Sequence, residues 1–151
     1  MQVAKALGAH VTAVVSARNV QRTVALGADE VIDYTQVDFT QTDARYDPVL
    51  DIAGSRPIRD CRALLTPTGR YLSSVGRLGF LLKLLVAKLV WRRVGFFHEQ
   101  VNPADLTTMA AWMAEGRIRT VVERQYPLDE APAALAAFLQ GPNGAKTVLT
   151  R

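Results

Sequence analysis

The stretch AHVTAVVSARNVQRTVALGADEVIDY, residues 9–34, decides how this chain folds. Residues 11–15 form a short run rich in β-branched side chains, which is typical of a buried parallel strand. Apolar residues with helical spacing follow, and Gly27 stands where a helix commonly ends in a left-handed residue. A second strand begins at Val31. The stretch therefore predicts a strand–helix–strand unit with a right-handed crossover.

The composition indicates a globular protein. The 151 residues are 49% hydrophobic and 21% charged, which suits one domain with a sizeable core. The net charge of +4 suits a small ligand that bears phosphate. The sequence lacks the runs of lysine and arginine with interleaved aromatic residues that are typical of nucleic-acid binding. The single cysteine, Cys61, excludes an internal disulfide and a multi-cysteine zinc site, and we expect it to be a packed or half-exposed helix residue. No signal-peptide pattern opens the chain, so a cytoplasmic location is expected.

Helix, glycine and strand recur along the chain, around Gly8, Gly27, Gly69 and Gly116. This repetition predicts an α/β fold with a doubly wound parallel sheet. Pro48 is expected at the start of its strand, because it has no N–H to give to a ladder. A short helix is expected within residues 36–47, further strands over 49–52, 70–75, 94–97 and 146–149, and further helices over 58–65, 78–91, 102–116 and 128–139.

Two of the expected helices have apolar stripes that predict a buried face. In the helix that begins at Asn102–Pro103 we expect Leu106, Met109, Ala110 and Met113 to point inward. In the last helix we expect the same of Ala131, Leu135, Phe138 and Leu139.

Residues 78–91 are the most apolar stretch of the chain. They fall short of the roughly 20 residues that span a bilayer, and Lys83 and Lys88 interrupt them. A helix in the core or at an interface is expected, so a membrane partner is not favoured. A helix on a membrane surface is the alternative, because Arg92 and Arg93 follow directly.

Five motifs resemble one known family. AKALGAHVTAVVSARN, LGADEVIDY, YDPVLDIAG, GRYLSSVG and YPLDEAPAALAAF are similar to the cofactor domain of medium-chain dehydrogenases/reductases, in the zinc-free quinone oxidoreductase-like branch. The resemblance extends from Met1 to Arg151. It implies a Rossmann-like doubly wound parallel sheet that lacks its first strand and its glycine-rich turn. Residues 1–151 would be a partial dinucleotide-binding domain, with the N-terminal substrate domain absent.

The missing strand has a consequence for folding. In the Rossmann order 3-2-1-4-5-6 it is central, so the strands over 11–15 and 49–52 lose their shared neighbour. They must pair directly, borrow a strand or leave backbone ladder groups exposed. We therefore expect the isolated chain to be marginally stable or oligomeric.

Four polar residues follow the first two strands and are the first candidates for ligand binding. Ligands of open α/β sheets bind beyond the carboxyl ends of strands, where Ser16, Arg18, Asn19 and Tyr34 stand. An acid at the end of the first of these strands would bind a ribose 2′-hydroxyl, whereas an arginine accommodates a 2′-phosphate. Arg18 and the lack of an acid before Asp29 predict NADPH in preference to NADH. The alternative is that Arg18 is only a solvated loop residue.

The resemblance implies further cofactor contacts. Gly54 and Gly76 would lie near the nicotinamide and its ribose, Phe97 near the carboxamide, and Lys146 near the phosphates. The alternatives are that the glycines serve turns and that Phe97 packs in a strand. Asp51 is expected to orient backbone groups, and the sequence names no catalytic acid, base or nucleophile and no metal ligands.

The resemblance implies the C-terminal portion of an NADPH-dependent oxidoreductase that delivers hydride to a quinone, an enone or a similar carbonyl compound. Whether this chain is active alone stays open. One alternative is a non-catalytic remnant that acts as a folding or dimerisation partner of a full-length relative, with a homodimer through the Val94–Phe97 strand. Another is a basic module that binds membrane surfaces through residues 78–93.

Overall fold

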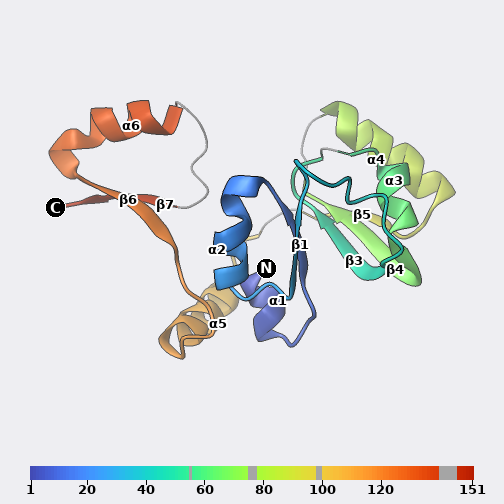
Figure 1. Ribbon diagram of the computed structural model, residues 1–151, viewed down its shortest axis with the longest axis horizontal. Coiled ribbons are helices and arrows are strands. Elements are labelled where there is room, and N and C mark those ends of the chain that lie inside the picture. Colours follow the sequence, from blue (N-terminus) through green and yellow to red (C-terminus); the bar gives the residue numbers. More distant parts are fainter. Residues whose placement is uncertain (55, 75–77, 98–99, 140–145) are drawn as a thin grey trace. The chain divides into compact units, whose positions relative to one another are not determined.

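The protein consists of two compact units, each built from parallel strands and helices. The structure, a computed structural model, describes residues 1–54, 56–74, 78–97, 100–139 and 146–151 (Figure 1). Unit 1 comprises Met1–Gln36 and Pro103–Arg151, and unit 2 comprises Val37–Asn102. The described strands form three parallel sheets in the orders β1-β2, β3-β4-β5 and β6-β7. The expected parallel α/β class is confirmed.

Unit 1 opens with the predicted strand–helix–strand segment. β1 and β2 run parallel, with Thr12 beside Glu30 and Val15 beside Asp33. Gly8 and Gly27 have φ values of +84° and +88°, a conformation that favours glycine, and each directly follows the end of a helix. The elements are α1 (Gln2–Ala6), β1 (Thr12–Val15), a 3-10 helix η1 (Ala17–Asn19), α2 (Val20–Ala25) and β2 (Glu30–Asp33).

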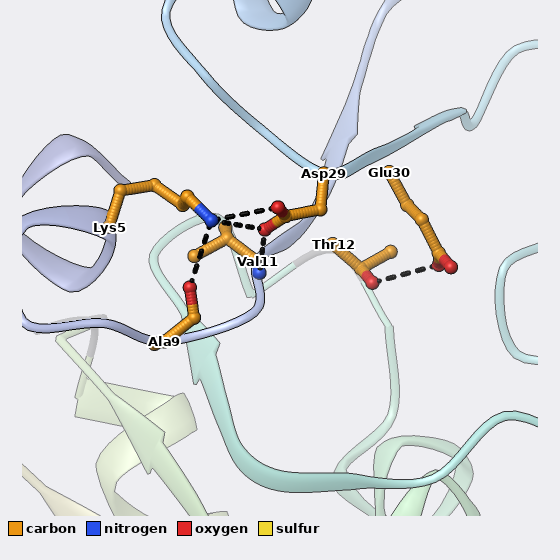
Figure 2. Close-up of polar contacts among 6 residues, drawn as sticks. All are labelled: Lys5, Ala9, Val11, Thr12, Asp29 and Glu30. Atoms are coloured by element: carbon orange, nitrogen blue, oxygen red, sulfur yellow. Dashed lines mark hydrogen bonds and ion pairs between the residues drawn. The ribbon is translucent and has the colours of Figure 1, made fainter.

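A polar cluster joins α1 to the starts of both strands (Figure 2). The Asp29 carboxylate accepts hydrogen bonds from Lys5 Nζ at 2.7 Å and from the Val11 N–H at 2.7 Å. Lys5 Nζ also donates to the Ala9 carbonyl at 3.1 Å. The hydrogen bond from Lys5, followed by that from Val11, lowers the pKa of Asp29 below its usual value. The Asp29 carboxylate, just before β2, therefore holds the turn between α1 and β1 in place.

The second part of unit 1 repeats the alternation of helix and strand. α5 begins at the predicted Pro103 and is followed by Gly116, whose φ is +72°. β6 pairs in parallel with β7, with Val122 beside Lys146 and Tyr126 beside Leu149. The elements are α5 (Pro103–Ala114), β6 (Val122–Pro127), a 3-10 helix η2 (Leu128–Glu130), α6 (Ala131–Leu139) and β7 (Lys146–Thr150).

The burial predicted for α5 and α6 is wrong at most of the named positions. Ala134 is buried in α6, and Ala131 and Trp112 are half-buried, whereas the other large apolar residues of both helices are exposed. An apolar stripe shows which side of a helix would be buried, but the described parts of unit 1 bury that side only in part. The exposed residues are Leu106, Met109, Met113, Leu135, Phe138 and Leu139.

Arg119 ties the two parts of unit 1 together. Its backbone N–H donates to Gln2 Oε1 at 2.8 Å, and its carbonyl accepts from Gln2 Nε2 at 2.9 Å. Its guanidinium donates to the Ala25 carbonyl at the end of α2, at 2.7 Å. A cation is favourable at this end of a helix, where carbonyl groups lack partners within the helix. Arg22 and Glu123 add an ion pair at 3.2 Å between α2 and β6.

Unit 2 holds the best-packed core. Tyr71 of β4 is fully buried, and Cys61, Leu65 and Val94 are buried with it. Side chains of α3 and α4, among them Ile58 and Ala87, pack against this cluster. The elements are β3 (Tyr46–Asp51), α3 (Ile58–Ala63), β4 (Leu65–Ser73), α4 (Leu78–Val90) and β5 (Val94–Phe96).

The strands of unit 2 differ from prediction at their amino ends. β4 begins at Leu65, so residues 66–69 belong to it, and Pro48 lies inside β3 instead of at its start. The register shifts between Tyr46 and Pro48: Tyr46 lies beside Leu65 but Pro48 lies beside Arg70, so β4 has more residues than β3 over this part of the pairing. Gly69 permits this close approach, because a Cβ there would lie 2.8 Å from the Tyr46 carbonyl oxygen. Residues 36–45 form turns and bends, so the helix expected there is absent.

β1 and β3 each have a strand neighbour on one side only within the described residues. In β1, the Val15 carbonyl accepts a hydrogen bond from the Tyr34 N–H on the side of β2. Backbone groups alternate along a strand, so the N–H and carbonyl of Val14 point to the opposite edge. In β3, the Asp51 carbonyl accepts from the Ser74 N–H on the side of β4, so the N–H and carbonyl of Leu50 point away from β4. Within the described residues each strand thus has one hydrogen-bonded partner strand, and the three outcomes expected for its other edge stay predictions.

Candidate functional site

Ser16, Arg18, Asn19 and Tyr34 lie at one edge of the β1-β2 sheet, as predicted. Ser16 directly follows β1, and Tyr34 directly follows β2. The Tyr34 N–H donates to the Val15 carbonyl at 3.0 Å, which joins the carboxyl ends of the two strands. The four residues therefore lie at the same edge, because the parallel strands end there.

The turn after β1 exposes Arg18 and holds its neighbours. Asn19 N–H donates to the Ser16 carbonyl at 2.8 Å, and Asn19 Nδ2 donates to Ser16 Oγ at 3.3 Å. Ser16 and Asn19 are half-buried, whereas Arg18 is exposed. Within the described ranges Arg18 has no ion pair, so its charge is available to an anion.

Two residues that support this edge were not predicted. Thr23 is buried and donates from Oγ1 to the Asn19 carbonyl at 2.8 Å, which fixes the start of α2. Asp33 accepts from the Thr35 N–H at 2.9 Å and from Thr35 Oγ1 at 2.7 Å, which holds the turn around Tyr34. The signals were a threonine four residues after Asn19 and an Asp-x-Thr sequence. Tyr34 itself is 52% exposed, so its ring is open to a ligand.

In unit 2, Asp51 orients backbone groups, as predicted. Its Oδ1 accepts from the Ala53 N–H at 3.1 Å and from the Gly54 N–H at 2.7 Å. Gly54 has φ +61°, so the turn after β3 needs a residue that tolerates this conformation. Asp51 Oδ2 accepts from the Tyr71 hydroxyl at 2.5 Å. Burial, and then this hydrogen bond, raises the pKa of the Tyr71 hydroxyl far above its usual value.

The other predicted cofactor residues lie on separate elements. The Phe97 N–H donates to the Ser73 carbonyl at 3.1 Å, which places Phe97 beyond the carboxyl end of β5, where it is half-buried. Lys146 is exposed at the start of β7, and its N–H donates to the Val121 carbonyl at 3.0 Å. The structure gives no hydrogen bond or ion pair between the Lys146 side chain and other described residues. Gly76 lies outside the described residues.

The described residues do not fit a zinc site. They contain no group of three or more histidine, cysteine, aspartate or glutamate side chains that could hold a metal ion. Cys61 is buried in the core of unit 2, and burial raises the pKa of its thiol to about 11, so the thiolate that zinc prefers is disfavoured. Among the described helices, none is both long enough and apolar enough to cross a membrane.

Comparisons with known proteins show the family of the chain. The family model described as zinc-binding dehydrogenase matches residues 26–149. A chloroplast envelope quinone oxidoreductase homolog of Arabidopsis thaliana is 27% identical over 99% of this chain and 47% of its own length. A mitochondrial NAD(P)H oxidoreductase of Mus musculus is 32% identical over 99% of this chain and 43% of its own length.

A solved structure, the quinone oxidoreductase from Coxiella burnetii, superposes with a TM-score of 0.82 at 28% identity, over 99% of this chain and 48% of that protein. The chain thus spans about half the length of the relatives it matches. The family match extends over most of the chain, including β2, α5 and β6. The chain belongs to the zinc-binding dehydrogenase family, in the quinone oxidoreductase-like branch of the medium-chain dehydrogenases/reductases.

Proposed function

We propose that this chain provides part of the cofactor site of an oxidoreductase that transfers hydride from NADPH to a quinone, an enone or a similar carbonyl compound. The names of its relatives, which include quinone and NAD(P)H oxidoreductases, support this class of reaction. Because the chain spans about half the length of those relatives, the activity of a whole protein is part of the proposal.

The observation that supports NADPH best is the exposed Arg18 beside Ser16 and Asn19, which has no ion pair with another described residue. A guanidinium group can donate two parallel hydrogen bonds to a phosphate, and it keeps its charge at any physiological pH. The Ser16 hydroxyl and the Asn19 amide add neutral hydrogen-bonding groups within the same turn. Arg18 would hold the 2′-phosphate of the adenosine ribose, and the exposed Tyr34 ring would lie along the adenine.

The bound cofactor would supply the hydride, while the protein groups bind and orient it. Gly54, Gly76 and Phe97 keep their predicted roles near the nicotinamide, and Lys146 keeps its predicted role near the phosphates. Asp51 would act only by holding the Gly54 turn, because both of its oxygens already accept hydrogen bonds. We assign no group of this chain to proton transfer.

The test is a titration of the chain with NADPH and with NADH, followed by cofactor fluorescence, for the wild type and for Arg18→Glu. We expect the variant to weaken NADPH binding by about tenfold or more and to leave NADH binding nearly unchanged, because only NADPH carries the extra phosphate. Arg59→Glu is the control, since Arg59 is an exposed arginine of α3 whose charge changes equally. An unchanged NADPH preference in Arg18→Glu would show that Arg18 is a solvated loop residue.

A second candidate function is a non-catalytic partner of a full-length relative, with pairing through Val94–Phe97. It is favoured by the strand order β3-β4-β5, which leaves one edge of β5 without a strand neighbour among the described residues. Steady-state oxidation of NADPH with a quinone acceptor separates the two candidates. Turnover by the chain alone supports the oxidoreductase, whereas dimers without turnover support the partner.

The cellular location stays a prediction. The cytoplasm is the expected compartment. Two relatives carry names that refer to the chloroplast envelope and to mitochondria. Fluorescent tagging of the natural protein would show which compartment applies.

A further inference from the structure

Unit 2 contains a cavity of about 420 Å³ around three arginines, Arg70, Arg92 and Arg93. Residues alternate between the two faces of β4, so Arg70 lies on the face opposite to the buried Tyr71. The Tyr71 N–H donates to the Arg93 carbonyl at 3.0 Å, which sets the segment before β5 alongside Arg70. The cavity therefore follows from the register of β4 and β5.

Gly95 cannot be replaced by a larger residue without moving the lining of this cavity. It lines the cavity together with Thr68 and Leu72. A Cβ at Gly95 would lie 2.7 Å from Leu72 Cδ2, so any larger residue would displace the leucine side chain. The lining thus combines apolar residues, the Thr68 hydroxyl and the three arginines.

The three arginines have no negative partner in the described part of the chain. Other arginines do, for example Arg56, which pairs with Asp38 at 3.3 Å, and Arg22, which pairs with Glu123 at 3.2 Å. The sequence explains the difference: between Asp60 and Glu99 it has seven lysines or arginines and no acidic residue. Like charges that converge on one cavity repel one another unless an anion lies between them.

We propose that the Arg70–Arg92–Arg93 cavity binds a phosphate group, carried by a small organic molecule or by a lipid headgroup. Guanidinium groups match the oxygens of a phosphate in geometry and in charge. The cavity lies beside the start of β5, whereas the carboxyl ends of the strands, at Gly54 and Phe97, hold the predicted nicotinamide contacts. It is therefore a second site, independent of the proposed cofactor function.

The experiment titrates the full chain with inorganic pyrophosphate, followed by calorimetry and by the amide NMR signals of Thr68 and Gly95. The variants are Arg70→Gln and the double variant R92Q/R93Q, and Arg59→Gln on α3 is the control. We expect both site variants to weaken pyrophosphate binding at least about tenfold, since each loses charge-assisted hydrogen bonds, and the control to bind like the wild type. Equal binding by the wild type and the site variants, or an equal loss in the control, would overturn the proposal.

A second arm identifies the source of the phosphate. Phosphatidylcholine vesicles with and without phosphatidic acid are sedimented with the chain. If the wild type is retained on the acidic vesicles and R92Q/R93Q is not, the ligand is a lipid headgroup. If the wild type binds pyrophosphate but is not retained on the vesicles, the ligand is a soluble molecule. Both results support the site, whereas the absence of both pyrophosphate binding and vesicle retention overturns the proposal. Arg18→Glu should leave the Gly95 signal shift unchanged, so failure of the NADPH proposal is distinguishable from failure of this one.

Discussion

The Tyr71 hydroxyl donates to Asp51 Oδ2 at 2.5 Å, and this bond links the centre of the unit 2 core to the turn after β3. The other oxygen of Asp51 holds the N–H groups of Ala53 and Gly54. One carboxylate therefore couples the packing of a fully buried side chain to the shape of a turn that carries a candidate cofactor residue.

Replacing Tyr71 by phenylalanine should destabilise the chain by roughly 2 kcal/mol, because the Asp51 carboxylate loses a donor inside the protein. The free energy of unfolding, measured by urea denaturation with circular dichroism, checks this. Tyr126→Phe is the control, since the structure gives the Tyr126 hydroxyl no hydrogen bond to a described residue, and it should change stability by less than about 0.5 kcal/mol. Similar losses in the two variants would contradict a stabilising role for the bond.

Asp29 should make the stability of the chain depend on acid. Its folded pKa is lower than its ordinary value of 3.8, so its stabilising effect is present above that pH and is lost as the pH falls through the depressed pKa. Urea midpoints measured between pH 6 and pH 2.5 should fall more steeply for the wild type than for Asp29→Asn. Asp43→Asn is the control, because Asp43 has no hydrogen bond or ion pair in the described structure. An identical pH profile for the wild type and Asp29→Asn would refute the assignment.

Two glycines should respond in opposite directions to alanine. Gly27 has φ +88°, and an added Cβ would strain the backbone although it meets nothing within 4 Å, so Gly27→Ala should cost about 1 kcal/mol. Gly79 lies within α4 and also has open space, so Gly79→Ala should be neutral or stabilise by up to about 1 kcal/mol. Thermal unfolding of the two variants measures the difference, and a loss of equal size at both sites would be evidence against it.

The segment from β1 to β2 could be predicted from the sequence because its determinants are local. Gly27 marks the end of α2, and Ser16 and Tyr34 each follow a strand directly. Parallel pairing then brings residues that are distant in sequence to one edge. The polar groups that support this edge, Thr23 and Asp33, act through side-chain bonds that apolar patterns do not reveal.

The remaining differences come from contacts between segments that are distant in sequence. β4 starts early because Gly69 allows it to lie against the Tyr46 carbonyl, and nothing near Gly69 in the sequence indicates that neighbour. The stripes on α5 and α6 correctly identify an apolar side, but Met113 and Phe138 on those sides are exposed. Periodicity describes one helix, whereas burial requires a second surface.

The position of Pro48 within β3 has a consequence for how the protein behaves at high concentration. The alternation along β3 directs its backbone nitrogen to the edge without a strand neighbour, beside the exposed Leu50. A proline nitrogen offers no hydrogen, so an incoming strand from another molecule finds one bond fewer at this apolar position. Pro48 thus disfavours the pairing of this strand edge with a strand of another molecule.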